Sequence, residues 1–134
     1  MKARRVLILE DDLATLQAIL GILEKVAGDV GVDFVPTVLS EYTQVLDYLN
    51  MADQNIYDII LLDRDCHAGG SFHCLDFAIY PIDKVIGISS VPEYNKQLTE
   101  LGVTRVITKN YEDLSEFVKV VERYIRELTK RPLQ

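Results

Sequence analysis

The hydrophobic residues of this chain fall into short continuous runs that alternate with amphipathic stretches. The continuous runs predict five strands, at residues 6–9, 32–38, 59–62, 85–88 and 105–108. A run that is apolar at successive positions is typical of a strand covered on both faces, as in a parallel sheet. Pro36 interrupts the second run and favours an edge position for that strand, because proline cannot donate to a strand ladder.

The amphipathic stretches predict helices between these strands. The first has an apolar face of Leu13, Leu16, Leu20, Leu23 and Ala27 and is expected to end at Gly28. The second is expected to begin at the cap residue Ser40 and to carry an apolar face of Tyr42, Val45, Leu46 and Leu49.

Three further helices are predicted in the second half of the chain. A short helix is expected over residues 72–80. Another is expected over residues 92–101, with Pro92 in its first turn and Gly102 just after its end. The last is expected to begin at a capping box of Asp113 and Glu116. Its apolar stripe consists of Leu114, Phe117, Val118, Val121, Ile125 and Leu128.

Strands and helices therefore alternate along the chain. Such alternation is typical of an α/β protein in which helices join parallel strands and pack on both faces of the sheet. The pattern predicts a doubly wound five-stranded parallel sheet. The length of 134 residues fits a single domain over residues 1–134, built on one hydrophobic core.

Composition narrows the setting in which the protein works. The longest apolar runs, such as Ile59 to Leu62, have four residues, whereas a membrane span needs roughly 20, so we expect no membrane segment and a cytoplasmic protein. The two cysteines, Cys66 and Cys74, are too few for a disulfide framework and favour reduced thiols. The net charge of −7 repels phosphate backbones and argues against direct nucleic-acid binding.

Reactive polar residues follow directly after four of the predicted strands. They are Glu10, Asp11 and Asp12 after the first strand, Asp63 after the third, Ser89 and Ser90 after the fourth, and Lys109 after the fifth. The carboxyl ends of parallel strands lie at one edge of a sheet, where ligands bind. We therefore expect these groups to form one cluster, in which neighbouring carboxylates need a cation to stay ionised together.

These residues, in this order and each at a strand end, resemble the receiver domains of two-component response regulators. The resemblance covers the whole chain and depends on Glu10, Asp11, Asp63, Ser89 and Lys109. It implies a flavodoxin-like (β/α)5 receiver fold. It also implies a signalling protein whose own chemistry is limited to the gain and loss of one phosphoryl group.

The resemblance implies a metal and a nucleophile. Asp63 is expected to be the carboxylate that takes the phosphoryl group. Mg²⁺ is expected to be held by Glu10, Asp11 and Asp63, together with the backbone carbonyl of Asp65, because Mg²⁺ prefers hard oxygen ligands.

Two further residues and the partners follow from the same resemblance. Lys109 is expected to neutralise a phosphoryl oxygen, and Ser89 to hydrogen-bond the phosphoryl group on Asp63, since phosphoryl transfer needs mainly positioning and charge neutralisation. The implied phosphodonor is a histidine kinase or phosphotransfer protein. The implied output is contact with a downstream protein target, and the oligomeric state is left open.

The chain departs from the family pattern around the expected site. The loop at residues 64–71 lacks the usual Met-Pro pair and carries two glycines instead. Asn110 stands where the family usually has a proline in a cis bond after the lysine, so we expect a trans bond here. Val106 stands where the family often has an aromatic switch residue, so output must use another element, for which Tyr94 and Tyr111 are candidates.

Other interpretations remain open. A pseudo-receiver would keep the fold as an interaction module that does not depend on phosphorylation, and the altered loop and Val106 favour it. A flavin- or nucleotide-binding domain of similar topology would need a glycine-rich loop after the first strand, where acidic residues stand instead. Asp11 and Asp12 are also suited to cap the first helix. The pairs Cys66–His67 and His73–Cys74 offer zinc ligands, but their spacing matches no zinc pattern.

Overall fold

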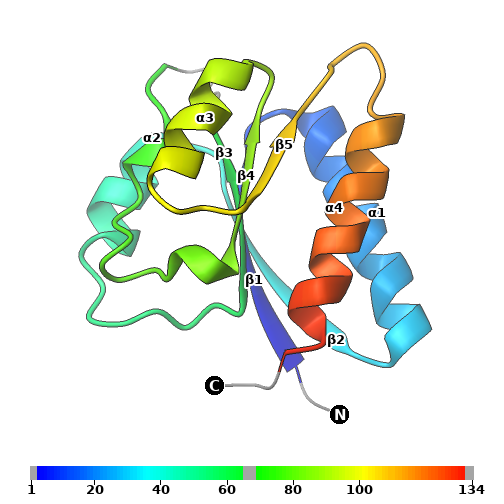
Figure 1. The fold of residues 1–134 in the computed structure, drawn as a ribbon. Coiled ribbons are helices and arrows are strands. Elements are labelled where there is room, and N and C mark those ends of the chain that lie inside the picture. Colours follow the sequence, from blue (N-terminus) through cyan, green and yellow to red (C-terminus); the bar gives the residue numbers. More distant parts are fainter. Residues whose placement is uncertain (1–2, 65–68, 132–134) are drawn as a thin grey trace.

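A computed structural model provides the structure, and it describes residues 3–64 and 69–131. Five parallel strands form one sheet in the order β2-β1-β3-β4-β5 (Figure 1). The strands are β1 (Ala3–Leu9), β2 (Asp33–Leu39), β3 (Ile59–Asp63), β4 (Val85–Ser89) and β5 (Arg105–Thr108). This order confirms the predicted five-stranded parallel sheet and the edge position of the strand that contains Pro36.

Helices cover both faces of the sheet. On one face, α1 (Leu13–Val30) and α4 (Ser115–Thr129) lie side by side (Figure 1). On the other face lie α2 (Tyr42–Gln44), which continues as the π-helical turn η1 (Val45–Leu49), and α3 (Pro92–Glu100). Between β3 and β4 the described chain has only two 3₁₀ turns, η2 (Phe72–Cys74) and η3 (Ile82–Lys84). The doubly wound architecture predicted from the sequence is thus confirmed.

The strands are buried on both sides, which explains their continuous apolar runs. Alternate residues of β1 and β3 enter two separate cores, one on each face of the sheet, so the expectation of a single core was wrong. Val6, Ile8, Ile59 and Leu61 pack with α1 and α4. Leu7, Leu9, Ile60 and Leu62 pack with η1 and α3. The two cores hold the sheet rigidly between its helices, and the sheet in turn fixes the positions of the strand ends.

The first helix differs from the prediction in its end and in its buried face. It continues through Gly28 to Val30, and Gly31 ends it with a φ of 70° and an N–H that donates to Ala27. The buried residues are Thr15, Ile19, Ile22, Leu23 and Val26. Leu13 is 78% exposed and Leu20 38% exposed, so the apolar face inferred from leucine spacing was wrong by part of a turn.

The predicted helix over residues 72–80 is wrong beyond its first turn. The side chain of Asn50 donates to the carbonyl oxygen of Cys74 (2.9 Å) and accepts the N–H of Asp76 (2.8 Å). The Asp76 carboxylate accepts the N–H of Ala78. These side chains satisfy backbone groups that a helix would have paired internally, so the segment stays irregular.

Two predicted helix caps are also wrong. Ser40 does not cap α2: its hydroxyl donates to the carbonyl oxygen of Glu10 (3.1 Å), and the side chain of Gln44 instead accepts the N–H of Glu41. Asp113 accepts the N–H of Ser115 (3.0 Å) ahead of α4, but the expected return bond from Glu116 does not form among the described contacts.

Among the described residues, no helix combines the length and hydrophobicity that a bilayer span requires.

Gly87 in β4 offers a test of how tightly α3 packs on the sheet. A Cβ atom at this position would collide with Cδ1 of Leu98, a residue of α3 that is 1% exposed. We expect Gly87→Ala to lower the free energy of unfolding by about 1–2 kcal/mol, as overpacking does. Gly21→Ala is the matched control, because its Cβ would meet nothing within 4 Å and a helix gains about 0.5–1 kcal/mol from this change. Urea denaturation measures both, and equal stability of the two variants would contradict this packing.

Candidate functional site

The register of the sheet brings the predicted residues to one edge. Leu9 in β1 is level with Leu62 in β3, so Glu10 and Asp63 follow at the same height on neighbouring strands. Ser89 in β4 is level with Thr108 in β5, and Lys109 extends this ladder by donating its N–H to the carbonyl oxygen of Ser89 (2.7 Å). The strand order places β1 beside β3, so this edge is also where the chain reverses its winding direction, the usual ligand site of such sheets.

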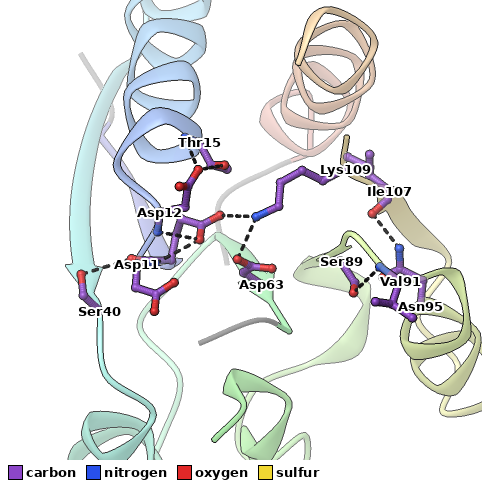
Figure 2. A network of polar contacts seen from close by, with 11 residues as sticks. Asp11, Asp12, Thr15, Ser40, Asp63, Ser89, Val91, Asn95, Ile107 and Lys109 are labelled. Atoms are coloured by element: carbon purple, nitrogen blue, oxygen red, sulfur yellow. Dashed lines mark hydrogen bonds and ion pairs between the residues drawn. The ribbon is translucent and has the colours of Figure 1, made fainter. Parts of the chain in front are cut away.

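Lys109 is the centre of the cluster (Figure 2). Its ammonium group lies 3.0 Å from Oδ2 of Asp63 and 3.2 Å from Oε1 of Glu10. The side chains of Lys109 and Asp63 are 0% exposed, and that of Glu10 is 1% exposed. Charges buried this deeply are tolerated only when they are paired and hydrogen-bonded. The two contacts of Lys109 therefore stabilise the buried cluster.

The electrostatics of the cluster are dominated by its burial. Burial, the hydrogen bond to Asp63 and the charge of Asp63 together raise the pKa of Glu10 to about 9, although Lys109 acts in the opposite direction. Burial alone would lower the pKa of Lys109, but the charges of Asp63 and Glu10 outweigh it and hold that pKa above its usual value. Lys109 is therefore a cation at neutral pH, and one such cation does not suffice to keep every neighbouring carboxylate ionised.

Three carboxylates converge at this edge. One oxygen from each of Glu10, Asp11 and Asp63 lies within 4.8 Å of the others. The second oxygen of Glu10 accepts the N–H groups of Asp11 (3.0 Å) and Asp12 (3.2 Å), which fixes the turn between β1 and α1. Hard carboxylate oxygens at this separation fit a divalent cation such as Mg²⁺ or Mn²⁺.

Asp11 and Asp12 have different roles. Asp12 is the N-cap of α1. Its carboxylate accepts hydrogen bonds from the backbone N–H (3.0 Å) and from the hydroxyl group (2.5 Å) of Thr15. Asp11 belongs to the carboxylate group instead (Figure 2). The capping alternative considered for both residues thus holds for Asp12.

Ser89 and α3 form the other side of the cluster. Ser89 is fully buried, and its hydroxyl oxygen accepts the N–H of Val91 (3.0 Å) at the start of α3. Asn95, 5% exposed, donates its side-chain amide to the carbonyl oxygen of Ile107 in β5 (2.6 Å) and so ties α3 to β5 (Figure 2). Asn95 could not be predicted from the sequence, because a single polar residue on a short helix has no pattern that marks it as buried.

Aromatic rings lie over two cations beside the cluster. The guanidinium of Arg64 lies 4.1 Å from the ring centroid of Tyr94, and the ammonium of Lys109 lies 4.5 Å from that of Tyr111.

Val106 packs with the core on the α3 side of the sheet. The described residues contain no cis peptide bond, which confirms the trans expectation for Asn110.

Some expected features lie outside the described residues. They include Asp65 with its carbonyl ligand, and Cys66 and His67. Among the described residues, the only grouping of three or more possible metal-binding side chains is that of Glu10, Asp11 and Asp63. Cys74 is a free cysteine, and burial raises the pKa of its thiol.

Comparison with known proteins gives matches among solved structures and none among family models or curated proteins. No protein-family model matches the sequence, and no curated protein matches it either. Among solved structures, the phosphorylated cyanobacterial phytochrome response regulator RcpA is 20% identical, with a TM-score of 0.75 over 98% of this chain and 97% of that chain. The Mn²⁺-bound form of response regulator Rcp1 is 17% identical, with a TM-score of 0.76 over 98% and 99%.

A third solved structure agrees with these two. A response regulator receiver domain from Rhodospirillum rubrum is 19% identical, with a TM-score of 0.71 over 96% of each chain. The similarity in each case extends over nearly the full length of both chains. The fold of this chain is that of the response regulator receiver domains.

Proposed function

We propose that this chain is a phospho-accepting receiver domain, which takes a phosphoryl group on Asp63 with Mg²⁺ bound beside it. The observation that carries the proposal is the convergence of Glu10, Asp11 and Asp63 within 4.8 Å, with the Lys109 ammonium 3.0 Å from Asp63. A nucleophilic carboxylate, a place for a divalent cation and a fixed positive charge are the parts that phosphoryl transfer to an aspartate requires. One structural neighbour is described in its Mn²⁺-bound form, which supports a divalent cation as a ligand of this fold.

Each residue has a role in the proposed reaction. A carboxylate oxygen of Asp63 forms a bond to phosphorus while the P–N bond of a phosphohistidine donor breaks. The leaving nitrogen keeps the bonding electron pair and ends with a proton from solvent. Lys109 balances the negative charge of the phosphoryl oxygens, and Ser89 turns its hydroxyl from Val91 toward the group on Asp63. Glu10 and Asp11, with Asp63, would hold Mg²⁺, which when bound supplies charge neutralisation to the phosphoryl oxygens.

The proposal includes partners. The donor is a histidine kinase or phosphotransfer protein, and the output is contact with a downstream protein. Residues 1–134 act as one receiver domain in this scheme. The test is incubation of the purified protein with a small phosphoramidate, with and without Mg²⁺, followed by intact mass measurement. A mass gain of one phosphoryl group that requires Mg²⁺ is expected.

A pseudo-receiver is the second candidate, and one observation favours it. Asp63 is 0% exposed and is already engaged by Lys109, so a phosphodonor reaches it only if the site opens. In that case the fold would serve as a binding module, and its contacts would not depend on Asp63. The mass measurement separates the two candidates, because a pseudo-receiver gains no mass with or without Mg²⁺.

The proposed cation site predicts a difference between two adjacent aspartates. Asp11→Asn removes one of the three grouped carboxylates and is expected to weaken Mg²⁺ or Mn²⁺ binding at least about tenfold, since even loss of a residue that only orients a metal ligand has such an effect. Asp12→Asn removes the same charge one residue away but keeps a good N-cap, so it is expected to change the affinity much less. Isothermal titration calorimetry measures both affinities. Equal weakening by both variants would show that the general negative charge, rather than this site, attracts the cation.

A further inference from the structure

The ammonium group of Lys109 has a third neighbour besides its two carboxylates. The ring of Tyr111 lies against it, at 4.5 Å from nitrogen to ring centroid. Lys109 is 2% exposed although it follows directly after the last residue of β5, while Tyr111 is 44% exposed. One face of the ring therefore meets the cation while part of the side chain is open to solvent, so the ring covers the ammonium group on this side.

A turn that begins at Asn110 brings the ring to this position. The side-chain oxygen of Asn110 accepts the N–H of Glu112 (3.0 Å). The backbone carbonyl oxygen of Asn110 accepts the N–H of Asp113 (3.2 Å). An asparagine that bonds the backbone two residues ahead forms a tight turn without a proline. The turn folds the chain back immediately after Lys109, in the loop that joins β5 to α4 (Figure 1). Tyr111 is its second residue.

We propose that Tyr111 is a positioning residue for the phosphoryl transfer on Asp63, because it holds the Lys109 ammonium group toward that carboxylate. The proposal rests on the function proposed above. A lysine side chain has four rotatable bonds and a strongly hydrated head, so a lysine at a strand end tends to turn into water. The electron-rich face of an aromatic ring attracts the ammonium group and excludes water from the side that the ring covers.

The contact matters because Lys109 has to meet a changing charge. When the phosphoryl group arrives, Lys109 must leave part of its contact with Glu10 and Asp63 and bind a phosphoryl oxygen. An ammonium group that is confined by a ring can make this short movement without turning into solvent. Without the ring, part of the population would have Lys109 directed into solvent, and transfer would be slower although the nucleophile and the cation ligands were intact.

Two substitutions separate the aromatic face from the bulk of the side chain. Tyr111→Phe keeps the ring and is expected to retain most of the rate of phosphorylation by a small phosphoramidate with Mg²⁺. Tyr111→Leu keeps an apolar side chain without the ring and is expected to slow it by about 3- to 30-fold, the range expected for a lost cation–π contact. Tyr48→Leu, a change at a 69% exposed tyrosine of η1, is the matched control and is expected to have no such effect.

The results distinguish this proposal from the underlying function. If the unchanged protein gains no mass, both the receiver function and the role of Tyr111 are refuted. If it gains mass and Tyr111→Leu reacts as fast as the unchanged protein, or if Tyr111→Phe is as slow as Tyr111→Leu, only the role of Tyr111 is refuted.

A second measurement does not depend on activity. The ring should shift the ε-methylene resonance of Lys109 upfield in the nuclear magnetic resonance spectrum of protein with labelled lysine. The shift is expected to persist in Tyr111→Phe and to disappear in Tyr111→Leu. An unshifted Lys109 resonance in the unchanged protein would overturn the proposal even if all variants fold.

Discussion

Asp63→Asn is expected to abolish phosphorylation of the protein. An amide oxygen is a very weak nucleophile and carries no charge to bind a divalent cation, so the variant loses the atom that would attack phosphorus and one of the grouped carboxylates. The amide still fits the buried position beside Lys109, because it has nearly the same shape as the carboxylate. Intact mass measurement after incubation with a phosphoramidate and Mg²⁺ is expected to show a gain for the unchanged protein and none for the variant.

The matched control for this experiment is Asp47→Asn. Asp47 is an exposed residue of η1, and its substitution changes the net charge by the same amount at a distance from the cluster. It is expected to gain a phosphoryl group at the normal rate. A mass gain in Asp63→Asn equal to that of the unchanged protein would mean that another residue accepts the group, and the assignment of Asp63 would be wrong.

Lys109→Met is expected to reduce both stability and reactivity. It leaves Asp63 without the cation that compensates it in a fully buried position. Breaking a buried ion pair in this way costs about 3–5 kcal/mol of unfolding free energy, and we expect the low end because Glu10, with its raised pKa, can hold a proton instead of a charge. Removal of a fixed charge from a transfer site lowers rates by roughly 100-fold or more. Chemical denaturation and the mass assay measure the two effects.

Lys119→Met provides the comparison. The Lys119 side chain is 76% exposed on α4 and contacts only Glu116 at 4.0 Å among the described ion pairs. Surface pairs of this kind contribute within about 0.5 kcal/mol, so this variant is expected to match the unchanged protein in stability and in rate. If Lys109→Met were equally stable and equally reactive, the buried contacts of Lys109 would have no functional meaning.

The sequence predicted the sheet and the position of the cluster for the same reason. Runs such as Ile59 to Leu62 are apolar at every position because both faces of β3 are buried, and a parallel sheet then brings Asp63, Ser89 and Lys109 to one edge. Neither inference depends on a detailed contact. Each follows from the pattern of apolar positions and from the parallel direction of the strands, and both can be inferred from the order of residues.

The sequence could not predict features that depend on contacts between distant residues. The helix expected over residues 72–80 ends after one 3₁₀ turn, because the side chain of Asn50, more than twenty residues earlier, bonds the backbone groups that follow. The buried face of α1 was misplaced because Leu13 and Leu20 fit the helical period although they face solvent, whereas Thr15 is buried. The ring of Tyr111 over Lys109 depends on a local turn at Asn110, whose geometry the sequence indicates only as a departure from proline.

The edge strand β2 has a consequence for the behaviour of the protein at high concentration. An uncovered strand edge is a template on which a second chain can add by backbone hydrogen bonding, and such addition begins fibril growth. Val35 and Val38 are partly exposed on β2, at 44% and 36%, and would favour it. Pro36 stands between them and has no N–H to offer, and Asp33 opens the strand with a charge. Pro36 and Asp33 thus protect this border of the sheet against aggregation.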